Sequence, residues 1–246
     1  MPVESIERFI RLLKESPPGA VFNPWWQVDK QDDVGRSAPT IRRKQLAAYL
    51  QRRIGKAKLV VIGEALGYRG GHFSGIPMTS ERIILGKKKE VVAALTRNLH
   101  GKSHHGGHRP PLQIIGSIKP RRTSKPEKCP DGFSEQTATI VWSALLGLGI
   151  KPEQVVLWNA FPWHSFDQRR GMLSNRMPTQ KERSAGLSVL EAFLDLFPCD
   201  EIVALGKIAA SQLEELNVES LRVRHPASGG ARLFRQQIGK IVKKLG

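Results

Sequence analysis

The stretch VVIGEALGYRGGHFSGIPMTS, residues 60–80, begins as an apolar run and then changes character. Val60, Val61 and Ile62 are β-branched, and Gly63 and Glu64 follow them directly. A short β-branched run bounded by glycine is typical of a strand that helices cover on both faces. Four more glycines precede Ile76, so the loop after the strand has few side chains. We therefore expect a buried strand that ends in a carboxylate.

Other segments of the chain repeat this pattern and alternate with helical patterns. The apolar runs are KLVVIG at residues 58–63, QVVLWN at 154–159, EIVALG at 201–206 and LRVRH at 221–225. Apolar residues recur at helical spacing in segments 39–53, 134–148, 182–197 and 234–245. Alternation of strands and helices predicts the α/β class, with a four-stranded parallel sheet covered by helices and joined by right-handed crossovers.

The chain has 246 residues, a length that fits one large domain or two smaller ones. Residues 100–133 are rich in proline, glycine and basic residues, which is typical of an inserted loop, and a short strand is expected near residues 112–118. Neither a repeat nor a clean linker divides the sequence. We expect one domain over residues 1–246, with an N-terminal helical segment 1–57 and a basic His/Pro-rich insertion at about 100–133.

The charge balance indicates a polyanionic partner. Lysine and arginine number 39 against 22 aspartates and glutamates, a formal net charge of +17. So large an excess favours nucleic acid as the partner over a basic protein with no particular partner. A membrane surface is less favoured, since no apolar run of about 18 residues is present. The N-terminus lacks the order of a signal peptide, which favours the cytoplasm. Cys129 and Cys199 are too few for a disulfide framework or a four-cysteine site.

Polar residues follow three of the four predicted strands. Glu64, Asn159 and His225 each stand at the end of a strand, and ligands of open parallel sheets bind at that edge. A carboxylate, an amide and an imidazole form a set that can handle a nucleic-acid base. Taken singly, each has a structural alternative: a turn cap, a loop support and a core histidine.

Five motifs in this order resemble those of the uracil-DNA glycosylase superfamily. They are VIGEALG at residues 61–67, HFSGIP at 72–77, LWNAFPWHS at 157–165, VALGKIA at 203–209 and VRHPASGG at 223–230. GEALG is similar to the GEAPG motif of the family-4 branch. The resemblance implies a three-layer α/β/α sandwich with a central four-stranded parallel sheet.

The resemblance also implies a reaction, hydrolysis of the N-glycosidic bond of uracil or a related deaminated base in DNA after the nucleotide is flipped from the stack. The implied catalytic residues are Glu64, which acts on the glycosidic bond, and His225, which contacts the leaving base. The implied substrate-binding residues are Gly63, Tyr68, Phe73, Asn159 and Ser228, with Phe73 stacking on the base and Asn159 reading its edge. Neither a metal nor an organic cofactor is implied, and we expect a monomer that binds single- or double-stranded DNA.

Two positions of the first motif depart from the pattern. Leu66 stands where GEAPG has proline, and Ala65 stands where other branches carry aspartate or asparagine. The four cysteines that hold an iron–sulfur cluster in the family-4 branch are absent. A catalytically silent protein that binds DNA or a damaged base is therefore an alternative. A nucleotide-phosphate loop is a third, although residues 67–75 do not fit G-x-G-x-x-G.

Three further segments have a predicted role. HGKSHHGGHRPP, residues 100–111, is more suited to contact with DNA phosphates than to a metal, since no carboxylate lies near its histidines. KPRRTSKPEK, residues 119–128, is a candidate for tracking a DNA backbone, with a solvated charged loop as the alternative. FNPWW, residues 22–26, is predicted to pack its tryptophans on the core rather than to stack on bases.

Overall fold

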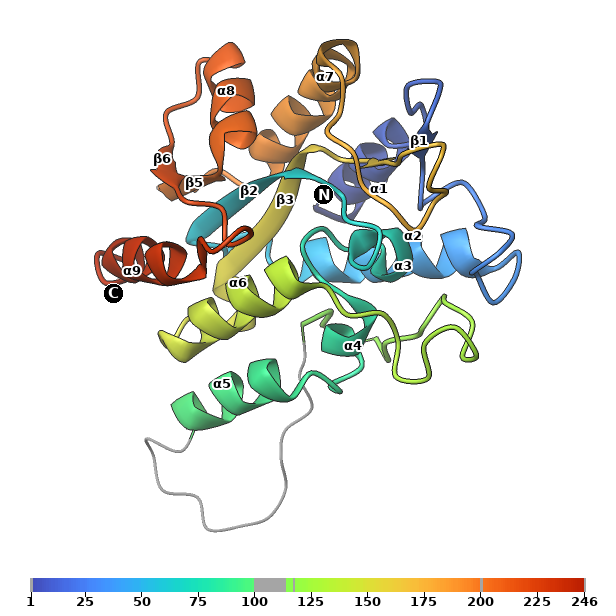
Figure 1. Cartoon of the computed structure of the whole chain (residues 1–246). Helices are drawn as coiled ribbons and strands as arrows, with labels where there is room; N and C mark the ends of the chain where they lie inside the picture. The colour runs from blue at the N-terminus through green and yellow to red at the C-terminus, as the bar shows by residue number, and fades with distance from the viewer. Residues whose placement is uncertain (1, 100–113, 117, 200, 246) are drawn as a thin grey trace.

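The computed structural model describes residues 2–99, 114–116, 118–199 and 201–245 (Figure 1). Its centre is a four-stranded parallel sheet in the order β3-β2-β5-β6. These strands are β2 (Leu59–Ala65), β3 (Val155–Phe161), β5 (Glu201–Leu205) and β6 (Leu221–Val223). The predicted α/β class and parallel sheet are confirmed, and each of the four strands begins within one residue of its predicted start.

Helices cover both faces of this sheet. Figure 1 shows α7 (Gln180–Leu196) and α8 (Lys207–Glu215) on one side and α6 (Gln136–Gly147) and α9 (Ala231–Val242) on the other. Two more helices, α1 (Pro2–Leu12) and α2 (Ala38–Gln51), pack together, and α5 (Lys89–Leu99) packs on α6. Leu59 to Ile62 and all of β3 are buried, as strands between two helical layers should be. None of the helices in the described ranges is long and apolar enough to span a bilayer.

The register of the two central strands aligns their carboxyl ends. Leu59 pairs with Val155, and four positions later Gly63 pairs with Asn159. On its other side, β2 pairs with β5, and the last pair is Ile62 with Ala204. The first motif therefore leaves the sheet beside the end of β3, where Asn159 lies.

The N-terminal segment packs on the core, as predicted for FNPWW. The Trp25 indole is fully buried and its Nε1–H donates to the Gly75 carbonyl at 3.0 Å. Next to it, β1 (Val21–Phe22) pairs antiparallel with β4 (His164–Ser165), a small ribbon that the sequence did not predict. The N-terminal segment therefore contacts the loop after β2, residues 66–80, which we call the first-motif loop. It also contacts the chain that follows β3.

The expected short strand near residues 112–118 is not formed by the part of it that the structure describes, residues 114–116 and 118. Ile114 and Ile115 are buried there instead, and the Ile114 carbonyl accepts a hydrogen bond from Arg53 Nη1 at 3.0 Å. Such a side-chain partner satisfies the backbone without a neighbouring strand. The histidine-rich residues 100–111 lie outside the described residues.

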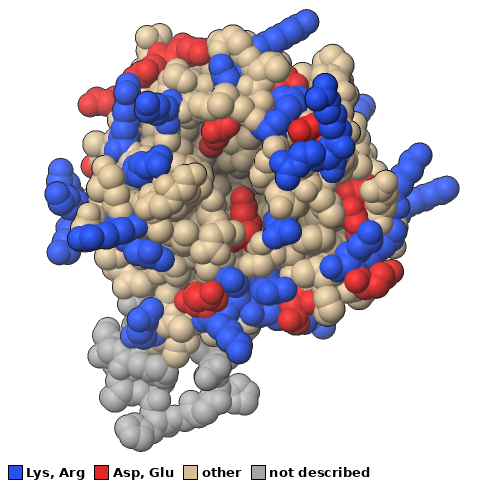
Figure 2. Space-filling model, in the orientation of Figure 1, with Lys and Arg blue, Asp and Glu red and all other residues tan. Residues whose placement is uncertain are grey.

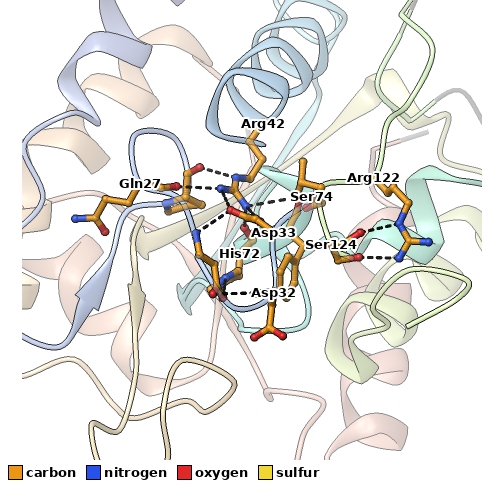
Figure 3. A network of polar contacts seen from close by, with 12 residues as sticks. Gln27, Asp32, Asp33, Arg42, His72, Ser74, Arg122 and Ser124 are labelled. Carbon is orange, nitrogen blue, oxygen red and sulfur yellow. Dashed lines mark hydrogen bonds and ion pairs between the residues drawn. The ribbon is translucent and has the colours of Figure 1, made fainter. Parts of the chain in front are cut away.

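A buried guanidinium joins three segments behind the first motif (Figure 3). Arg42 forms a two-pronged ion pair with Asp33, at 2.8 and 2.9 Å, and neither side chain is exposed. Arg42 also donates to the carbonyls of Pro24 at 2.6 Å and His72 at 3.0 Å, and to the hydroxyl of Thr123 at 3.3 Å. The N-terminal segment, the loop after β2 and the end of the insertion are thus held by one side chain.

A second buried charge holds the far side of the insertion. Glu81 opens the short helix α4 (Glu81–Ile84) and is fully buried. Its carboxylate accepts from the backbone N–H groups of Thr123 at 2.6 Å, Ser124 at 3.0 Å and Phe133 at 3.3 Å, and from the Ser124 hydroxyl. Charge-assisted bonds of this kind are the stronger ones in proteins. They fix the chain immediately before α6.

We predict that Arg42→Ala lowers the free energy of unfolding by roughly 3–5 kcal/mol, because it leaves the Asp33 carboxylate buried without its partner. Urea unfolding followed by circular dichroism measures the change. The matched control is Lys87→Ala, which breaks an ion pair with Asp131 whose side chains are 48% and 60% exposed. An exposed pair contributes only about 0–1 kcal/mol. Equal losses in the two variants would contradict the role given to Arg42.

Candidate functional site

A cavity of about 350 Å³ lies at the carboxyl ends of β2 and β3. Its walls come from four short segments of the chain, namely residues 63–67, residues 135 and 137, residues 175–177, and residues 225 and 227, together with Met78 and Asn159. Parallel sheets commonly bind their ligands at this edge. Of the seven predicted site residues, the cavity brings together Gly63, Glu64, Asn159 and His225, whereas Tyr68, Phe73 and Ser228 do not line it.

Glu64 points a half-buried carboxyl into the cavity from the end of β2. Burial raises the pKa of Glu64, and the charge of Arg183 on α7 opposes that shift. Desolvation disfavours the charged form of a carboxyl, so this group takes up a proton at a higher pH than an exposed glutamate.

Asn159 lies beside Gly63 in the sheet, and its side chain is buried. The Asn159 Oδ1 atom has no hydrogen-bond partner within the described protein. A Cβ atom on Gly63 would lie 2.8 Å from Asn159 Nδ2 and 2.9 Å from Met78 Sδ. Glycine at this position therefore makes room for the amide, which presents a free acceptor to the cavity.

The His225 imidazole follows β6 and is half-buried. Burial lowers the pKa of His225, and the nearby charge of Arg224 lowers it further, so the neutral ring prevails over a wider pH range. The backbone N–H of Ala227 donates to His225 Nδ1 at 3.1 Å. In the neutral ring the hydrogen consequently sits on Nε2, which leaves that atom as a donor.

Phe73 lies in α3 (Gly71–Ser74), and its side chain is fully buried, so no face of the ring is open to a base. The ring is fully buried and stacks on Phe133 at a centroid distance of 4.4 Å and an angle of 6°, with His72 at 4.3 Å. A base would have to take the place of Phe133 to stack on it, so the stacking role stays a prediction. The other two residues outside the cavity are Tyr68, whose N–H donates to Asn175 Oδ1 at 3.0 Å, and Ser228, which is exposed with φ of 51°.

Glu135 lines the same cavity, and the sequence did not predict it. Burial raises the pKa of Glu135 to about 7, and its Oε2 atom has no partner within the described protein. The carboxyl lies against Gly67 and Gly70 so closely that a Cβ atom at either position would overlap it. The glycines at positions 67 and 70 were the available signal, because glycine often marks a place where another part of the protein packs closely against the backbone.

A chain of buried polar contacts connects the N-terminal segment to the cavity wall. Asp29 Oδ2 lies 3.1 Å from His72 Nε2, and His72 Nδ1 lies 2.9 Å from His164 Nδ1. His164 Nε2 donates to the Ser174 carbonyl at 2.7 Å, next to the wall residue Asn175. Burial lowers the pKa of His164 to about 3. These contacts hold the wall segment at a fixed distance from the first-motif loop.

Basic side chains surround the hollow on the face shown in Figure 2, and acidic atoms lie within it. Such an arrangement attracts a polyanion to the rim, while the carboxyls occupy the depth. Among the residues that the structure describes, no three histidine, cysteine, aspartate or glutamate side chains are grouped to hold a metal ion.

Comparisons with known proteins agree with this architecture. The family model described as the uracil DNA glycosylase superfamily matches residues 52–243. Among solved structures, 23 chains match, including the crystal structure of wild-type Pedobacter heparinus SMUG2. That structure aligns with a TM-score of 0.54 over 98% of this chain and 97% of its own, at 12% sequence identity. Comparison with curated proteins gives no match.

We predict that Gly63→Ala lowers the free energy of unfolding by about 1–3 kcal/mol, because the added methyl group collides with Asn159 and Met78. The control is Gly147→Ala at the end of α6, where a Cβ atom meets nothing within 4 Å. That change should raise stability by roughly 0.5–1 kcal/mol through helix propensity. Urea unfolding compares the two, and a neutral Gly63→Ala would show that the amide does not need this space.

Proposed function

The chain belongs to the uracil DNA glycosylase superfamily, and from that premise we propose that it hydrolyses the N-glycosidic bond of uracil, or of a related deaminated base, in DNA. Membership of the superfamily supports a DNA glycosylase-like function and DNA binding. Our proposal goes further in two respects: this chain is catalytically active, and the base that it releases is uracil or a related deaminated base.

The observation that carries the proposal is the meeting of Glu64, Asn159 and His225 in one cavity. These side chains come from the ends of three different strands, separated by 95 and 66 residues along the chain. A buried amide with a free acceptor, a carboxyl and a neutral imidazole supply the groups that base recognition and glycosidic cleavage need. No cofactor is required for this chemistry.

The proposed reaction begins with extrusion of the nucleotide, since the glycosidic bond is out of reach inside a duplex. Asn159 Oδ1 accepts the base N–H, and its Nδ2 group donates to an adjacent carbonyl oxygen. As the C1′–N bond breaks, the ionised Glu64 stabilises the positive sugar and aligns a water molecule whose oxygen bonds to C1′. His225 Nε2–H donates to the carbonyl oxygen that gains negative charge, and the departing base takes up the proton released by water.

A catalytically silent binder is the second candidate, and the first motif favours it. Ala65 lines the cavity without supplying a polar group, and Leu66 packs its side chain onto Gly71. If Glu64 alone cannot align water, the same cavity would bind an extruded base without cleaving it.

We expect Glu64→Ala, Asn159→Ala and His225→Ala each to slow base release from a uracil-containing oligonucleotide at least ~100-fold, because each removes a group aimed at the base or the sugar. Single-turnover release is measured by alkali cleavage of the abasic product, with a matched thymine oligonucleotide as reference. The raised pKa of Glu64 adds a pH dependence: release falls as the pH drops through that pKa, since only the ionised carboxyl acts.

The matched control is Glu191→Ala, which removes an exposed carboxylate on α7 that does not line the cavity. It should release uracil at the wild-type rate. Full activity in Asn159→Ala would contradict the proposed base-reading site. Uracil-selective binding by a wild-type protein that leaves the strands intact would favour the silent binder.

A further inference from the structure

We propose that Glu135 is a further base-contacting residue of the cavity, where it donates a hydrogen bond to a carbonyl oxygen of the extruded base. This inference rests on the proposed function and assigns a specificity role within the same site. It would make the cavity selective for deaminated bases, which carry carbonyl oxygens where cytosine and adenine carry amino groups.

The position of Glu135 is one that a structural role does not explain. It is the residue before the first turn of α6, where serine, threonine, aspartate or asparagine normally caps the helix. The Glu135 side chain accepts no hydrogen bond from the helix amides. It is directed into the cavity, where Thr137 of the same helix also forms part of the wall. The Glu135 side chain therefore lines the cavity and does not cap the helix.

The backbone around the Glu135 carboxyl leaves just enough space for it. Gly67 and Gly70 face it from the first-motif loop, and either would overlap it if it carried a side chain. Four residues before α6, the Gly132 backbone lies against Glu81, the carboxylate that holds the chain before the helix. The carboxyl is therefore positioned from two sides, by the loop after β2 and by the anchored start of α6.

The chemistry of the group follows from its lack of partners. None of the ion pairs in the described protein includes Glu135, and its Oε2 atom is buried without a hydrogen-bond partner there. Burial alone raises its pKa to about 7, so a large fraction of the molecules carry a protonated carboxyl near neutral pH. A protonated carboxyl donates through O–H and accepts through its other oxygen, unlike a carboxylate, which only accepts.

The second carboxyl of the cavity has a different environment. The pKa of Glu64 is raised by burial, but Arg183 favours its charged form, whereas no cation among the described residues acts in this way on Glu135. When two carboxyls in one site have surroundings that move their pKa values apart, one can act as the acid and the other as the base. We assign the ionised role to Glu64 and the donor role to Glu135.

The test is the pH profile of single-turnover uracil release by the wild type, Glu135→Gln and Glu135→Ala, from about pH 5.5 to about pH 9. Wild-type release should decline by up to about tenfold per pH unit above pH 7, as the Glu135 proton is lost. Glutamine keeps a donor that does not ionise, so Glu135→Gln should stay active and lose this decline. Glu135→Ala should be slower than the wild type by about tenfold or more below pH 7, and it should also lack this decline.

Selectivity and folding provide the controls. Binding of uracil and cytosine oligonucleotides, measured by fluorescence anisotropy, should show uracil preference in the wild type and Glu135→Gln and a loss of it in Glu135→Ala. Glu191→Gln removes an exposed carboxylate outside the cavity and should match the wild type in every assay. Thermal unfolding confirms that each variant is folded.

The outcomes separate the two proposals. An active wild type whose profile and uracil preference are unchanged in both Glu135 variants would overturn the role of Glu135 and leave the proposed function standing. A wild type that neither binds uracil selectively nor releases it would overturn the proposed function, and the role of Glu135 with it. If the wild type binds uracil selectively without cleaving it, loss of that preference in Glu135→Ala supports the role of Glu135, and an unchanged preference overturns it.

Discussion

The buried ion pair between Arg42 and Asp33 is the interaction on which the arrangement of the site depends. Removing both charges from water has a large free-energy cost, which is offset only when the geometry is close and the remaining donors are satisfied. Arg42 meets this condition through carbonyls of the N-terminal segment and the first-motif loop. Both partners precede residue 52, where the match to the family model begins. A segment outside the matched region thus holds the loop inside it.

The glycines at the end of β2 and in the loop after it serve the packing of side chains from elsewhere in the protein. Gly63 makes room for Asn159, Gly67 and Gly70 for Glu135, Gly71 for Leu66, and Gly75 for Arg42. From the sequence alone, the same glycines suggest space for a nucleotide near the backbone. The structure fills most of that space with the protein, and what remains open is the cavity at the strand ends. A loop with few side chains can therefore be among the most closely packed parts of a site.

Much of the fold was predictable because its signals are local. The β-branched runs gave the four strands and their parallel direction, and the ends of those strands gave three of the cavity's polar residues. Glu135 was missed because its role comes from burial and from a loop about 70 residues earlier, neither of which has a local pattern. The covered faces of Phe73 were missed for the same reason, since Phe133 is brought to it by the buried carboxylate of Glu81. The β1–β4 ribbon, two residues per strand, is too short for a periodic signal.

Two polar atoms of the cavity, Asn159 Oδ1 and Glu135 Oε2, are buried without a partner in the described protein. Each such group costs folding about 1–3 kcal/mol unless something from outside the chain forms a hydrogen bond with it. Apolar side chains of similar shape at these positions would remove that cost and abolish recognition together. The cavity is thus a place where the sequence favours binding over stability, and selection for a more stable chain alone would remove these two side chains first.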